Sequence, residues 1–128
     1  MAAISDLAQL LRSMVPGLAP EEYGFGLSQG QSVPGAFATV AEAEGLTVVA
    51  PVAALQAAGV AHQPGWARIS LAVHSDLQAV GLTAAIAQAL AAAGISANVI
   101  AGYHHDHIFV RWLRRHEAMA ILKGLSDA

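Results

Sequence analysis

The chain has 128 residues, of which 55% are hydrophobic and 12% are charged, and its net charge is −3. Soluble domains carry roughly 25% charged residues, so this chain has ample apolar surface to bury, and a disordered protein is excluded. The slight acidic excess argues against binding of nucleic acid, which requires a basic surface. The absence of cysteine excludes disulfides, thiol catalysis and cysteine-bound zinc, and it fits a cytoplasmic protein.

One uncharged stretch of 27 residues, 77–103, is as long as a transmembrane helix. Polar residues interrupt this stretch, Gly94 marks a helix end inside it, and alanine supplies much of its hydrophobicity. The N-terminus lacks the basic cluster and apolar run of a signal peptide. We therefore expect a soluble protein with no membrane span, part of whose apolar surface faces another subunit.

The N-terminal half alternates short helical and strand patterns. We expect a helix over 7–14, capped by Ser5 or Asp6 and ended by Pro16-Gly17, followed by a strand over 23–27 and a polar loop over 29–35. Next come a hairpin of strands 37–42 and 46–50 that turns at Glu44-Gly45, and a helix over 52–58 that begins after Pro51. Gly24 and Gly26 alternate in the first strand and indicate close approach of backbone or ligand there. Residues 62–65 are the only predicted linker.

The C-terminal half repeats this alternation of helix and strand patterns. We expect a strand over 68–74, a helix over 79–93, strands over 98–102 and 108–112 around the polar turn 103–107, and an amphipathic helix over 114–122. A shift of 62 residues lays the hairpin 37–50 over 99–112. Strand–helix–strand–strand–helix is most of a ferredoxin-like βαββαβ unit, and two such small units bury too little surface separately. We predict an α+β fold with two halves, 1–62 and 65–128, that share antiparallel sheets with helices packed on them and form one cooperative domain.

The run "HSDLQAVGLTAAIAQALAAAGISANVIAGYHHDHIFV", residues 74–110, resembles an ACT domain, a small regulatory module that binds amino acids. The resemblance rests on an acidic loop at Asp76, on Gly81 near the start of a long helix, and on the helix end 93–95. The whole chain is similar to short stand-alone tandem-ACT proteins of bacteria, and "EAEGLTVV" in the first half supports this. Common ACT domains have Asp-x-x-Gly, whereas here four residues separate Asp76 from Gly81. The longer loop means that no specific ligand preference carries over from enzyme-linked ACT domains.

The loop before the second-half helix is the first candidate site. Backbone N–H groups at a helix N-terminus favour an anion such as a carboxylate, and Gly81 leaves room for a ligand backbone. Asp76 is placed to receive an α-ammonium group, so a zwitterionic amino acid suits the loop. The alternative is ordinary capping by Ser75 or Asp76 with Gly81 as a packing residue. The predicted ligand-binding residues are Ser75, Asp76, Leu77, Val80, Gly81, Leu82 and Asn98.

The histidine-rich turn 104–107 is the second candidate site. His105 and His107 are two residues apart and share a side if the chain is extended, as in a two-histidine zinc or nickel pair. His74 or Asp76 is the candidate for a third ligand. The alternative is an ordinary polar turn, and pH sensing by the histidines is a further hypothesis. We expect Glu42 and Glu44 to form a solvated rim, and Arg111, Arg114 and Arg115 to decorate an exposed face.

The predicted function is a non-catalytic regulatory module that binds a small molecule, an amino acid as the resemblance implies, with no cofactor. We expect a cytoplasmic homodimer that passes its signal to an effector protein. One alternative is a small metal-dependent enzyme built on the turn 104–107. The other is a purely structural assembly protein.

Overall fold

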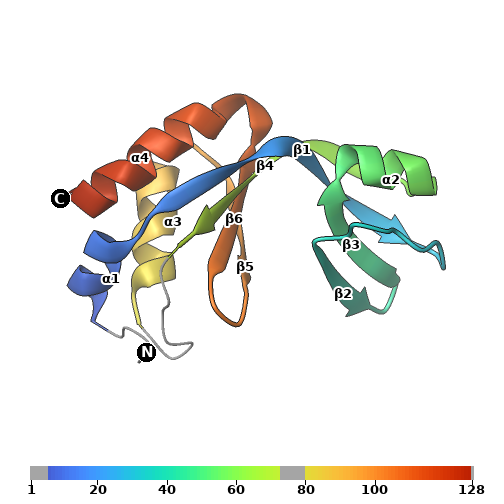
Figure 1. Cartoon of the computed structure of the whole chain (residues 1–128), viewed down its shortest axis with the longest axis horizontal. Helices are drawn as coiled ribbons and strands as arrows, with labels where there is room; N and C mark the ends of the chain where they lie inside the picture. The colour runs from blue at the N-terminus through green and yellow to red at the C-terminus, as the bar shows by residue number, and fades with distance from the viewer. Residues whose placement is uncertain (1–5, 73–79, 128) are drawn as a thin grey trace. The chain divides into compact units, whose positions relative to one another are not determined.

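The computed structural model describes residues 6–72 and 80–127. The elements run in the order α1 (Leu7–Ser13), β1 (Pro16–Ser28), β2 (Ala38–Glu42), β3 (Gly45–Pro51), α2 (Val52–Ala58), β4 (His62–Leu71), α3 (Leu82–Ala92), β5 (Ala97–Ala101), β6 (Asp106–Arg111), a 3-10 turn η1 (Trp112–Arg114) and α4 (Arg115–Asp127) (Figure 1). The strands are hydrogen-bonded in the order β2-β3-β1-β4-β6-β5.

The chain divides into two compact units. Unit 1 comprises Met1–Ala19 and Arg68–Ala128, and unit 2 comprises Pro20–Ala67. The long strands β1 and β4 therefore each contribute to both units. They run antiparallel, because Leu27 N–H donates to the carbonyl of Ala61 near one end and Ala72 N–H to that of Val15 near the other.

Unit 2 has the strand order β2-β3-β1-β4, which is the order of a ferredoxin-like sheet. The hairpin turns where expected, with Glu42 opposite Gly45, and α2 begins directly after Pro51. Its core contains four buried residues of β3, α2 and the segment before β4: Val48, Ala50, Leu55 and Val60. Gly26 on β1 lets this core approach closely, since a Cβ there would lie 2.8 Å from Val60 Cγ1. Close approach at the alternating glycines is thus confirmed.

Unit 1 has the equivalent order β5-β6-β4-β1, with β1 as its fourth strand although β1 comes first in the chain. Helices α1, α3 and α4 contact one another and contribute the fully buried residues Leu10, Leu90 and Leu122 (Figure 1). Asp6 caps α1, because its carboxylate accepts a hydrogen bond from Gln9 N–H at 2.9 Å. Each unit is therefore a small α+β sheet, and the tandem ferredoxin-like fold is confirmed.

The predicted linker at residues 62–65 is wrong, because these residues begin β4. Proline and glycine are typical of a linker, but Pro64 and Gly65 lie within the strand, which departs from regular extended geometry at Gly65. Gly65 has a φ of +91° and its N–H donates to the Glu22 carboxylate at 2.8 Å. Pro16 and Gly17 end α1 as expected, but they also open β1, which is much longer than the strand expected over 23–27. The assignment of 1–62 and 65–128 as the two halves stays a prediction.

Candidate functional site

The predicted ligand loop meets the described part of the chain at the start of α3. Gly81 is the N-cap residue of α3 and adopts a left-handed conformation with φ +103°. Leu82 follows it and is buried, whereas Val80 before it is 83% exposed. Three of the predicted ligand residues, Ser75, Asp76 and Leu77, lie outside the described residues, as does His74.

Glycine is favoured at position 81 on structural grounds, apart from any ligand role. A left-handed backbone costs an L-residue roughly 1–2 kcal/mol, and a Cβ at this position would lie 3.1 Å from Leu7 Cδ2. A branched residue such as valine is therefore disfavoured at this helix start, because both the backbone conformation and the contact with α1 oppose it.

The N-terminus of α3 differs chemically from that of α1. Asp6 supplies a carboxylate to the first turn of α1, whereas glycine at the N-cap of α3 has no side chain to offer. The first N–H groups of a helix need an acceptor from elsewhere, and the helix dipole favours an anionic one. The start of α3 is therefore suited to a carboxylate.

Asn98 lies on a different element from Gly81 and Leu82. It is exposed on β5, directly opposite Phe109 on β6. Of the predicted ligand residues, Gly81 and Leu82 therefore lie at the start of α3 beside α1, whereas Asn98 lies on strand β5.

The histidine-rich segment is split between a turn and a strand. Gly102 N–H donates to the carbonyl of His105 at 2.9 Å and closes the turn, in which Tyr103 is 78% exposed. His107 belongs to β6, and its Nδ1 is 2.7 Å from Ser70 Oγ on β4. His105 lies outside the strand, so the argument that both imidazoles share one side of an extended chain does not apply.

Burial controls the acid–base properties of this segment. It lowers the pKa of the His107 imidazole, and Arg68 and His105 lower it further, against the opposing effect of Asp106. Burial also raises the pKa of the Asp106 carboxyl, although His107 and His105 act against this rise. Within residues 6–72 and 80–127, no three His, Asp or Glu side chains form a group that could hold a metal ion.

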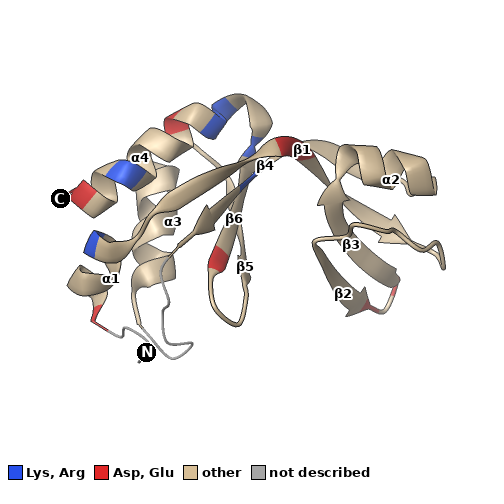
Figure 2. Cartoon of the chain, viewed as in Figure 1, with Lys and Arg blue, Asp and Glu red and all other residues tan. Residues whose placement is uncertain are grey.

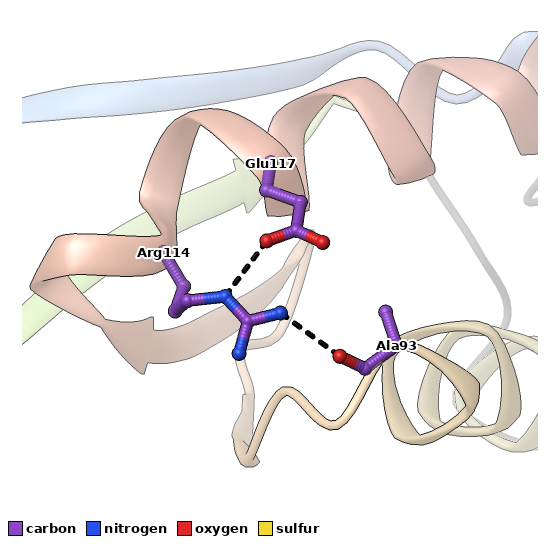
Figure 3. Close-up of polar contacts among 3 residues, drawn as sticks. All are labelled: Ala93, Arg114 and Glu117. Carbon is purple, nitrogen blue, oxygen red and sulfur yellow. Dashed lines mark hydrogen bonds and ion pairs between the residues drawn. The ribbon is translucent and has the colours of Figure 1, made fainter.

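The arginines near the C-terminus have structural contacts. Arg114 donates to the Ala93 carbonyl at the end of α3 (2.9 Å) and to Glu117 (2.7 Å) (Figure 3). Arg115 lies 3.7 Å from the centre of the Trp112 ring, a cation–π contact, and donates to the Trp112 carbonyl. The Arg114–Ala93 bond joins η1 to the end of α3, and the other contacts join η1 to α4.

The glutamates of the β2–β3 hairpin are both exposed, as expected for a solvated rim. Two features were not predicted from the sequence: Thr47 donates to the Glu42 carboxylate, and Glu42 lines an open groove with residues of β1 and β4. That groove is assembled from three separate stretches of chain, so only the folded structure reveals it.

None of the helices in the described residues has the length and apolar character needed to span a membrane.

Two family models of ACT domains match the chain, one over residues 2–64 and the other over residues 61–124. Among solved structures, a Vibrio cholerae protein described as being of unknown function and a possible transport protein shares 44% identity, with a TM-score of 0.82 over 94% of this chain and 95% of its own. A protein from Agrobacterium tumefaciens is 19% identical, with a TM-score of 0.73 over 88% of this chain and 89% of its own. No curated protein matches the chain.

Aspartate kinases share the fold at low identity. Aspartokinase III of E. coli, in complex with aspartate and ADP, is 10% identical, with a TM-score of 0.67 over 89% of this chain and 33% of its own. The regulatory subunit of aspartate kinase from Thermus thermophilus is also 10% identical, with a TM-score of 0.59 over 88% of this chain and 98% of its own. ACT domains are typically regulatory modules that bind small molecules. The two matches and the two ferredoxin-like units place this chain in the ACT-domain family, as a tandem-ACT protein.

Proposed function

We propose that this chain is a non-catalytic regulatory module that binds a free amino acid at the N-terminus of α3. The observation that carries the proposal is the start of α3, which begins at the left-handed Gly81 with no side chain at its cap. The helix N–H groups would receive the α-carboxylate. Asp76, which lies outside the described residues, would receive the α-ammonium group, with Ser75, Leu77, Val80 and Leu82 around the ligand.

Assembly and signalling are part of the same proposal. Strand β2 ends the hydrogen-bonded order of unit 2, and four of its five residues are exposed, including Val40 at 52%. An exposed strand edge is a template for pairing with another chain. We propose a cytoplasmic homodimer that pairs through such an edge or through its alanine-rich helices, and that passes ligand binding to an effector protein.

A thermal-shift screen of the full chain over the twenty amino acids and divalent metal ions tests the function. A ligand at 100 times its Kd raises stability by about 2.7 kcal/mol, which moves the melting temperature by several degrees. Stabilisation by one amino acid or a few is expected. Stabilisation by metals alone would support a metal-dependent role for the histidine turn instead, and no response to any compound would support a structural assembly role.

Asp76→Asn locates the site once the ligand is known. Asparagine has nearly the same size and shape as aspartate but no charge, so the fold should be kept while the ammonium contact is lost. We expect amino-acid affinity to fall about tenfold or more by calorimetric titration. Asp6→Asn is the matched control, because it removes the same charge from the N-cap of α1 and should leave affinity unchanged. Equal affinity in both variants would contradict this site.

A further inference from the structure

Unit 2 carries an open groove of about 570 Å³ on its strands. Its lining comes from β1, the β2–β3 hairpin and the start of β4, chiefly Phe25, Leu27, Glu42, Thr47, His62 and Gln63. This volume is within the range of small-molecule sites, which combine an apolar surface with a few polar groups. The groove is formed entirely by unit 2, so it is separate from the start of α3 in unit 1.

The charge of unit 2 has one sign. Residues 20–67 contain four glutamates and neither lysine nor arginine. Figure 2 accordingly shows acidic residues at the β2–β3 hairpin and no basic residue on β2, β3 or α2. A surface of this kind attracts cations and repels carboxylates and phosphates.

The carboxylate in the groove is a hydrogen-bond acceptor. Thr47 Oγ1 donates to the Glu42 carboxylate, which holds this charge in one orientation at the groove. Held in this orientation, the Glu42 carboxylate suits an ammonium group, which has only N–H donors.

The remaining lining is apolar. Phe25 and Leu27 are half-buried on β1, and Phe25 has an edge-to-face contact with Trp66, with ring centroids 5.5 Å apart. Ala61 adds a small side chain on β4. An aromatic or aliphatic group of a ligand would bury its surface here while its cationic end meets Glu42.

We propose that this groove binds an organic amine, a primary ammonium group carrying an apolar substituent and no carboxylate. The proposal goes beyond the amino-acid site and does not depend on it. The two ligands differ in charge, since an amino acid brings a carboxylate that the acidic unit 2 disfavours.

Titration of the full chain with 2-phenylethylamine, followed by backbone amide NMR, tests the proposal. We expect saturable shifts at the amides of Ala61, His62 and Gln63. The carboxylate analogue 3-phenylpropionate and the neutral 3-phenylpropanol should bind at least about tenfold more weakly, because neither offers a charge-assisted bond to Glu42. Equal binding of all three compounds, or no saturable shift at those amides up to about 10 mM amine, would overturn the proposal.

Glu42→Gln removes the charge but keeps an acceptor for Thr47, and it should weaken amine binding about tenfold or more. Glu44→Gln is the matched control: it removes the same charge from the same hairpin at a residue that does not line the groove. Similar losses in both variants would show diffuse attraction only and would refute a specific site. Thr47→Val should give a smaller loss, because it only frees the Glu42 side chain. Asp76→Asn should leave amine binding unchanged, which separates failure of this proposal from failure of the amino-acid site.

Discussion

The two units have the same strand order but different connections after the equivalent central strand. In unit 1, β4 leads to α3, a helix of 11 residues, before the hairpin β5–β6. In unit 2, β1 leads to a helix-free segment, residues 29–37, before the hairpin β2–β3. The order of strand pairing therefore survives without the first crossover helix, because it depends on backbone hydrogen bonds between strands and not on that helix.

Because no helix lies between β1 and β2, unit 2 has fewer helical residues to pack against its sheet than unit 1. Its only helix, α2, has 7 residues and contributes one fully buried side chain, Leu55. Val33 from the helix-free segment packs against the same cluster and covers part of the gap. Gly24 and Gly26 bring β1 close to Leu55 and Val60, so a small core is filled by close approach of the backbone.

The largest expected effect is the loss of the central side chain of unit 2. Leu55→Ala should lower the free energy of unfolding by about 2–5 kcal/mol, because it removes buried methyl groups and leaves a cavity. Both units should lose stability together, since they share β1 and β4. Denaturant unfolding of Leu55→Ala, followed by the fluorescence of Trp66 in unit 2 and Trp112 in unit 1, measures this.

Single-tryptophan variants, Trp66→Phe and Trp112→Phe, separate the two signals. Leu122→Ala, in the core of unit 1, is the matched substitution. Coincident transitions in every variant are expected for one cooperative domain. If Leu55→Ala shifted only the Trp66 signal and Leu122→Ala only the Trp112 signal, the units would unfold independently and the prediction of one domain would be wrong.

A smaller effect is expected from a methyl group added to β1. Gly26→Ala places a Cβ 2.8 Å from Val60 Cγ1 and 3.1 Å from the Ala61 carbonyl, so it should cost about 1–3 kcal/mol by overpacking. Gly17→Ala adds the same group to the same strand in unit 1, where the nearest atom is 3.9 Å away. It should leave the free energy of unfolding within about 0.5 kcal/mol of the parent. Equal costs at the two positions, measured by urea unfolding, would contradict close packing specific to unit 2.

The smallest expected effect is a pH dependence confined to unit 1. The pKa of His107 is lowered in the folded chain, so below its ordinary value of 6.5 the unfolded chain binds the proton more readily. Stability should therefore fall as the pH is lowered from about 7.5 to 5.5. Asp106 acts in the opposite sense and at lower pH, because its raised pKa makes the folded chain bind its proton more readily.

Thermal unfolding of His107→Gln across this range checks the assignment. Glutamine can still hydrogen-bond to Ser70 but does not titrate, so the decline should become shallower. His104→Gln, at an exposed position in the adjoining turn, is the control and should keep the parent slope. A slope that changes only in the control would contradict the role of His107.

Local sequence signals were sufficient for several elements. The Glu44-Gly45 turn, the helix that follows Pro51 and the Asp6 cap all appear where the pattern placed them, because each depends on residues within a few positions of one another. The ACT resemblance likewise follows from the local pattern around α3. The site at the start of α3 was predicted in part, but the left-handed conformation of Gly81 and its contact with Leu7 were not.

By itself the sequence determined which segments form helices and hairpins, since propensity, capping and turn chemistry act over short distances. Only the tertiary structure decided that the breaker residues at 16–17 and 64–65 belong to the two long strands. A strand is held by hydrogen bonds to a partner far away in the chain, so Pro64 and Gly65 are tolerated where Glu22 takes the Gly65 amide. The same cause hides the groove of unit 2, because Glu42 and Gln63 come to line one groove only when β1 pairs with both β3 and β4.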